Sequence, residues 1–212
     1  MGEKVMGTKE PFNDTHSNFD KWRILKIHDE LFHFLRDHNV IFMPRQKSSE
    51  RLNQGYWFIG DDNYLSISFY TGGDTKNKTP NITFHVYLSE FYLGKINRSR
   101  SPIPLSCIQL SNTVGSSGWK TKELVINEII KKLGGFECNR ATNSIEERWN
   151  RFYENCSYND ADYLKCLEDF LTNDKPIIDG IISDAKNSEI VFLEKNKVDR
   201  KISNIEKIRG IT

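Results

Sequence analysis

The spacing of apolar residues changes along the chain, and this change predicts the elements of the fold. From about residue 20 to residue 38, apolar residues recur every three or four positions, which indicates an amphipathic helix packed against a core. In residues 63–70 and 81–88 they occupy every second position, which indicates two strands. Residues 55–60 form a third apolar run. Because the connections are short, we expect a three-stranded antiparallel meander.

The middle of the chain adds one more strand and one more helix. Residues 105–110 fit a strand, and residues 122–133 place their apolar side chains on one helical face. Gly134 and Gly135 then supply a helix stop. The predicted fold class is therefore α+β, with an antiparallel sheet packed on amphipathic helices.

The last third is expected to be mostly helical. Ser144 and Glu147 have the spacing of a capping box, which predicts a helix after them. Residues 160–171 follow the helical period, and Pro176 is expected to start a short helix. Residues 189–194 predict a strand.

This pattern divides the chain into three regions. We expect a flexible N-terminus over residues 1–18 and a sheet-containing α+β region over residues 19–135. A helical C-terminal region over residues 136–212 is expected to pack on the second region as one domain.

Composition excludes a disordered chain but leaves the partner open. The 212 residues are 37% hydrophobic and 12% aromatic, which is enough for a sizeable core. The formal net charge of +1 does not distinguish between classes of partner. Locally, residues 43–100 carry eight basic and five acidic residues, whereas residues 136–179 carry ten acidic and five basic ones. An anionic partner would therefore prefer the first half.

No targeting segment is recognisable, and the cysteines form no close pair. The first residues contain no apolar signal region, and no apolar run approaches the ~18 residues of a membrane span. Cys107, Cys138, Cys156 and Cys166 include no C-x-x-C spacing, so buried reduced thiols are expected rather than a zinc site. These observations predict a cytoplasmic protein without a membrane partner.

The second face of the predicted sheet is the first candidate for function. Its alternate residues are aromatic or hydroxylic and include no acid, and basic loops lie nearby in the sequence. Aromatic rings can stack on bases, and cations can bind phosphates. An ordinary solvated strand face is the alternative. The predicted nucleic-acid contacts are Tyr64, Tyr70, Lys76, Lys78, His85, Tyr87, Arg98 and Arg100.

Other constellations fit known chemistry less well. The loop over residues 71–79 lacks the spacing of a Walker loop and leads into a strand rather than a helix. Asp29, His33 and Asp37 lie four apart on the first helix, which suits a metal, but charge pairs on that face explain them equally. His28 is expected in the core. We therefore expect no metal and no cofactor.

A metal-dependent nuclease is the enzymatic hypothesis, and it ranks below two non-enzymatic ones. The least unsuitable candidates for its site are Asp179, Asp184, Lys186 and Glu189. Asp184 and Lys186 have the Asp-x-Lys letters but stand before the predicted strand rather than on it. Surface charge is the better explanation.

The last residues resemble a segment of a known family. Residues 201–211, KISNIEKIRGI, resemble the opening strand of the ATPase head in large bacterial defence and repair ATPases. The resemblance implies an accessory N-terminal region that recognises DNA or a partner protein such as a larger ATPase. The chain has no Walker loop after this segment, so it is not expected to bind ATP in that way.

Together these observations predict a non-enzymatic module that binds nucleic acid, DNA in the first place and RNA as the other candidate partner, in a bacterial restriction or phage-defence system. The alternative is a protein–protein adaptor or inhibitor that uses the acidic helical half. A metal-dependent nuclease is the third hypothesis.

Overall fold

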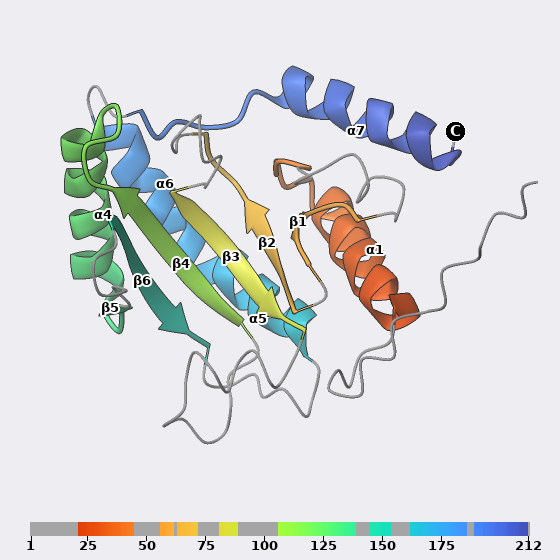
Figure 1. Cartoon of the computed structure of the whole chain (residues 1–212), viewed down its shortest axis with the longest axis horizontal. Coiled ribbons are helices and arrows are strands. Elements are labelled where there is room, and N and C mark those ends of the chain that lie inside the picture. The colour runs from red at the N-terminus through yellow and green to blue at the C-terminus, as the bar shows by residue number, and fades with distance from the viewer. Residues whose placement is uncertain are drawn as a thin grey trace, which may run out of the picture.

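A twisted antiparallel sheet organises the molecule (Figure 1). The computed structural model describes residues 21–44, 56–61, 63–71, 81–88, 106–138, 145–153, 162–185 and 189–211. Within them the sheet has six strands in the order β1-β2-β3-β4-β6-β5, and every neighbouring pair is antiparallel. The strands are β1 (Ile59–Gly60), β2 (Tyr64–Ser68), β3 (Ile82–Tyr87), β4 (Ser106–Thr113), β5 (Glu137–Cys138) and β6 (Glu146–Phe152). The predicted α+β class and the meander of its first three strands are confirmed.

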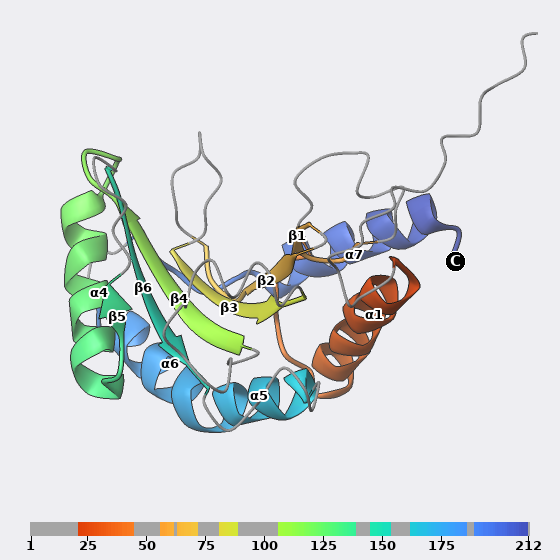
Figure 2. The ribbon, with the colours of Figure 1, turned by 60° about the horizontal axis from the view of Figure 1, so that its bottom comes forward.

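Helices cover one face of this sheet and lie beside its β1 end (Figure 2). They are α1 (Lys21–Asp37), α4 (Trp119–Leu133), α5 (Tyr163–Asp169), η1 (Phe170–Asp174), α6 (Lys175–Asp184) and α7 (Lys195–Arg209). The segments α5, η1 and α6 follow one another without a break and pass below the sheet with α4. Helix α7 lies near α1, and Arg36 of α1 bonds Asp199 of α7 at 3.0 Å.

The core lies between the sheet and the helices, as the alternating strand pattern predicted. Leu65 and Ile67 of β2 pair with Val86 and Phe84 of β3, and all four are fully buried. Phe170 of η1 packs on this layer, with its ring centroid 5.4 Å from that of Phe84. Burying each such side chain contributes about 1.5–3 kcal/mol, so this layer is a main source of stability.

Three elements of the last third differ from the sequence prediction. The prediction of a helix after Ser144 is wrong, because Glu146–Phe152 is strand β6 and pairs with β4. The strand expected over residues 189–194 is reduced to an isolated bridge between Tyr70 and Phe192. Residues 201–209, which resemble an opening strand, belong to helix α7, so the implied strand is not formed there.

The predicted regions share this sheet. Strand β6 comes from residues 136–212, yet it lies beside β4 of residues 19–135. Buried residues of both regions, such as Phe84 and Phe170, belong to one hydrophobic cluster. Residues 1–18, the predicted flexible N-terminus, lie outside the described residues.

The cysteines depart from the expectation of reduced thiols. Cys107 and Cys138 are free, but the buried Cys166 is disulfide-bonded, which corrects the prediction for that residue. Of the helices that the structure describes, none has the length and apolar character needed to cross a membrane.

Candidate nucleic-acid interface

The polar face of the sheet brings together three of the predicted contact residues. In the pairing of β2 with β3, Tyr64 lies opposite Tyr87, and Ser66 lies opposite His85. The rings of Tyr64 and His85 stack with centroids 5.6 Å apart, and the centroid of Tyr87 is 6.3 Å from that of His85. The prediction that these side chains share one face is confirmed.

This face is largely closed to solvent. Tyr87 is 2% exposed and His85 is 7% exposed, while Tyr64 is half-buried. A base that stacks on an aromatic ring needs an exposed ring face, and the two most buried rings do not offer one in this arrangement. Contact between these residues and nucleic acid therefore stays a prediction.

Burial holds His85 in its neutral form within a hydrogen-bonded network. Ser66 Oγ and His85 Nε2 lie 3.1 Å apart, and Gln109 Nε2 donates to Asn150 Oδ1 at 3.0 Å. Burial, reinforced by the charge of Arg148 and opposed by a hydrogen bond with Gln109, lowers the pKa of His85 to about 3. A neutral imidazole brings no charge to a phosphate, and so weak a base does not activate the Ser66 hydroxyl.

The thiol beside this network is equally unreactive. Cys107 of β4 pairs with His85, and its Sγ lies 3.4 Å from the Tyr87 hydroxyl. Burial raises the pKa of Cys107 to about 12, although the bond with Tyr87 opposes this shift. Because the thiolate is the nucleophilic form, Cys107 and His85 do not form a catalytic pair.

Tyr70 lies apart from the sheet cluster and is 4% exposed. Its hydroxyl donates to Asp179 Oδ1 of α6 at 2.7 Å. Burial, then this bond, raises the pKa of Tyr70. Its phenol therefore links the segment after β2 to α6, and its nucleic-acid contact stays a prediction.

The predicted phosphate contacts are the basic residues of two loops. Lys76, Lys78, Arg98 and Arg100 lie outside the described residues. Their binding of nucleic acid is therefore still an expectation from the sequence.

Asp29 of α1 forms an ion pair with Arg209 of α7, which the sequence did not suggest. Asp29 accepts hydrogen bonds from Trp57 Nε1 at 2.7 Å and from Arg209 Nη1 at 3.0 Å. The Arg209 guanidinium also lies 4.6 Å from the centroid of the Trp57 ring. His33 and Asp37 line the same pocket as Asp29. Among the described residues, no group of three His, Cys, Asp or Glu side chains could hold a metal.

Two of the nuclease candidates are likewise bonded to other side chains. Asp179 accepts from Lys175 Nζ at 2.7 Å as well as from Tyr70. Glu189 is bonded to Lys122 and Ser117, and Lys186 is outside the described residues. Asp179 and Glu189 thus have partners elsewhere, whereas Asp184 lines a groove between α4 and α6, and this arrangement gives no support to a nuclease site.

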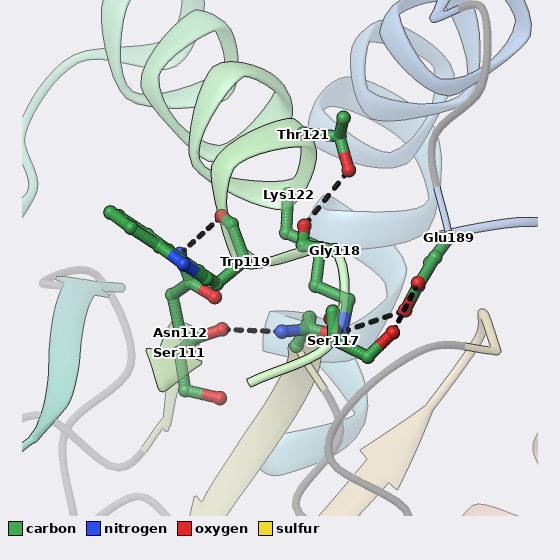
Figure 3. A network of polar contacts seen from close by, with 9 residues as sticks. Ser111, Asn112, Ser117, Gly118, Trp119, Thr121, Lys122 and Glu189 are labelled. Atoms are coloured by element: carbon green, nitrogen blue, oxygen red, sulfur yellow. Dashed lines mark hydrogen bonds and ion pairs between the residues drawn. The ribbon is translucent and has the colours of Figure 1, made fainter. Parts of the chain in front are cut away.

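The sequence missed a polar network where α4 begins (Figure 3). Lys122 is 1% exposed; its Nζ donates to the Ser117 carbonyl at 2.7 Å and lies 3.1 Å from Glu189 Oε2. The Ser117 hydroxyl donates to Glu189 Oε1 at 2.9 Å. The bond from Lys122, then that from Ser117, lowers the pKa of the Glu189 carboxyl. A signal was present, because Lys122 precedes Val125 and Ile126 at the spacing of the buried face.

Gly118 makes room for this network. It has φ 62°, and a Cβ at this position would lie 2.5 Å from Glu189 Cδ. The positive end of the α4 dipole therefore has the exposed carboxylate of Glu189 beside it. Through Glu189 the network links the start of α4 to the segment before α7, and we assign it a structural role.

The most cationic element of the described chain is α7. Its fifteen residues include six lysines and arginines and two acids, against 30 and 29 in the whole chain. Val198, Ile202 and Ile205 are buried on one side. The exposed residues of the opposite side, which we call the α7 outer face, are Lys197, Arg200, Asn204 and Lys207.

The cations of the α7 outer face are only partly neutralised. Lys197 Nζ lies 2.6 Å from Glu194 Oε1 in an exposed pair. Arg200 and Lys207 have no ion pair among the described residues. Asp199 is turned aside and bonded to Arg36. The sequence missed this face because residues 201–211 were interpreted only through their resemblance to an opening strand.

Comparison of the chain with protein-family models, curated proteins and solved structures found no significant match.

Proposed function

We propose that the chain is a nucleic-acid-binding module and that the α7 outer face contacts the phosphate backbone. The observation that carries the proposal is the acid-free outer face with Arg200 and Lys207 unpaired. Cations that neutralise phosphates release counterions, and this release drives association. The Asn204 amide can add a hydrogen bond to a phosphate oxygen.

The geometry of α7 favours recognition of the backbone rather than of a base sequence. Arg200 and Lys207 are two helical turns apart, or about 10 Å at ~1.5 Å per residue. Two cations at this spacing can each neutralise a phosphate, and phosphate contacts carry no direct information about the base sequence. The preferred ligand is therefore DNA or RNA without a strong sequence requirement.

The proposal does not depend on the family resemblance of residues 201–211. That resemblance suggested a bacterial restriction or phage-defence system through an opening strand, and these residues are helical up to Arg209. The charge of α7 supports binding of nucleic acid in any such system.

The test is fluorescence anisotropy with labelled mixed-sequence DNA, single- and double-stranded, at low and moderate salt. We expect binding that weakens steeply as salt rises. Arg200→Glu with Lys207→Glu should weaken binding about tenfold or more, because two contacts become repulsive. The matched control is Lys131→Glu with Lys165→Glu, which changes the net charge equally on exposed lysines of α4 and α5.

The possible results test nucleic-acid binding and its assignment to the α7 outer face separately. Absence of binding at low salt would refute the proposed function. Equal weakening by the α7 variant and the control would refute the assignment to α7 and leave only a general charge effect. Selective weakening by Lys76→Glu with Lys78→Glu would place the contact on the loop that the sequence predicted.

A further inference from the structure

The outer side of α4 and the C-terminal end of α6 enclose an open groove of about 460 Å³. It lies at the opposite end of the sheet from α1 and α7 (Figure 1). The lining side chains are apolar along the middle and charged at the ends. They are Thr121, Leu124, Val125, Glu128, Lys132, Ile181, Asp184 and Ala185.

An apolar side chain stands at the rim of this groove. Leu124 is 70% exposed, the highest value among the large hydrophobic residues that the structure describes. Ile177, one turn before Ile181 on α6, is 42% exposed. The Leu124 side chain and the apolar lining of the groove are both exposed to water in the single chain. Binding of another surface would bury both, which is favourable.

A glycine in the middle of α6 points to the same side. Gly180 follows Ile177 by three residues and precedes Asp184 by four, so it shares their side of the helix. Glycine inside a helix lowers its stability, and a Cβ at Gly180 would meet nothing within 4 Å. Packing within the chain therefore does not require glycine here, whereas close approach of another molecule would.

The charges at the groove identify the occupant. Lys132 and Asp184 line it, and neither has an ion pair among the described residues. Both side chains are exposed, and a surface complementary to the groove would place a carboxylate by Lys132, a cation by Asp184 and an apolar side chain in the recess. A second copy brings all three through its own Asp184, Lys132 and Leu124.

We infer that this groove is the interface of a homodimer with two-fold symmetry. In such an isologous contact, each Leu124 enters the groove of the other copy, and Lys132 of each copy faces Asp184 of the other. The backbones approach at Gly180. This inference is independent of nucleic-acid binding, because it uses none of the α7 residues.

Sedimentation equilibrium of the full chain, from low to high micromolar concentration, tests the inference. We expect a monomer–dimer equilibrium, and Leu124→Asp should raise its dissociation constant by about 100-fold or more, because each dimer contains the contact twice. The matched control is Ile208→Asp, which changes a 55% exposed side chain on α7 in the same way and should leave the equilibrium unchanged.

A charge swap tests the proposed pairing directly. Lys132→Glu and Asp184→Lys should each weaken self-association, since two like-charge contacts replace two ion pairs. An equimolar mixture of the two variants should dimerise again, because each chain then supplies what the other lacks. This rescue does not depend on the folding of the Leu124 variant.

Two results would overturn the inference. The first is a wild-type chain that stays monomeric at the highest concentration. The second is a dimer that neither Leu124→Asp nor the charge variants weaken while circular dichroism shows them folded, which would place the contact elsewhere.

Discussion

Lys122 and His85 are two buried ionisable side chains with different partners, one charged and one uncharged. Lys122 keeps a carboxylate partner, with Glu189 Oε2 3.1 Å from its Nζ. His85 instead meets the hydroxyl of Ser66, and the nearby charge is the cation of Arg148. Burial favours the neutral form of a group that has no opposite charge beside it. At the residue scale, one site therefore pairs a buried cation with an exposed carboxylate, and the other holds an uncharged network.

The neutrality of His85 gives a pH-dependent prediction. Its pKa is lowered from 6.5 to about 3, chiefly by burial. The unfolded chain therefore takes up a proton as pH falls through about 6.5, while the folded chain does not, so stability falls from there toward about pH 3. NMR titration of the folded protein should show unchanged His85 ring signals at pH 6.5, and His85→Gln should flatten this part of the stability profile. A His85 midpoint near 6.5 would contradict the description of the network.

Gly118 gives a second prediction at this scale. Gly118→Ala should destabilise the protein by about 2–3 kcal/mol, from the positive φ and the displacement of Glu189. Gly115→Ala is the matched control, because Gly115 also has positive φ but a Cβ there meets nothing within 4 Å. Chemical denaturation measures both. Equal losses would show that Glu189 is not fixed against Gly118.

At the element scale, apolar spacing identified those elements that bury one regular face. Helices α1 and α4 and strands β2 and β3 begin and end within a few residues of their predicted bounds. Strand β6 was mistaken for a helix because Ile145, Trp149 and Phe152 are spaced as on one helical face. Its pairing with β4 over seven positions decides the outcome, and such long-range pairing leaves no local signal.

The candidate surfaces were predictable to different degrees. The shared face of Tyr64, His85 and Tyr87 follows from alternation, but the burial of His85 and Tyr87 depends on what covers the face. The α7 outer face was within reach of the sequence, because Val198, Ile202 and Ile205 lie four and three apart. Residues 201–211 were interpreted only through their resemblance to an opening strand, so this spacing was not used.

The π-helical turn η1 lies between α5 and α6, and hydrogen bonds to its Asp174 connect this helical segment to the sheet. Asp174 within it is 5% exposed and accepts hydrogen bonds from Arg151 Nη1 at 2.6 Å and from the Tyr153 hydroxyl at 2.5 Å. A π-helical turn shifts the side chains that follow it around the helix axis. The wide turn thus places a carboxylate against the end of β6.

Loss of this carboxylate should be costly. We expect Asp174→Ala to lower the free energy of unfolding by about 3–5 kcal/mol, because it leaves a cation and a hydroxyl without their buried acceptor. Urea denaturation at neutral pH measures the change. Glu168→Ala, which removes an exposed carboxylate from α5, is the control and should change stability by less than about 0.5 kcal/mol. Similar effects of the two variants would contradict the role of η1.

At the scale of the whole molecule, the two proposed surfaces lie at opposite ends of the sheet (Figure 1). A dimer through α4 and α6 leaves both copies of α7 uncovered. Two cationic faces on one particle bind a long nucleic acid more tightly than either alone, provided the ligand spans both. Leu124→Asp should then weaken binding to long DNA but not to a short oligonucleotide, and anisotropy with the two lengths measures this difference. Equal weakening for both lengths would contradict the link between the surfaces.

The central claim is that Arg200 and Lys207 bind phosphates. Its most direct test is the slope of log Kd against log salt concentration for the wild type and for Arg200→Gln with Lys207→Gln, which removes two charges without adding repulsion. Each phosphate contact contributes about 0.9 to the slope on double-stranded DNA. We predict that the variant's slope is smaller by about 2. An unchanged slope, or a change equalled by neutralising Lys131 and Lys165, would contradict the assignment of the interface to α7.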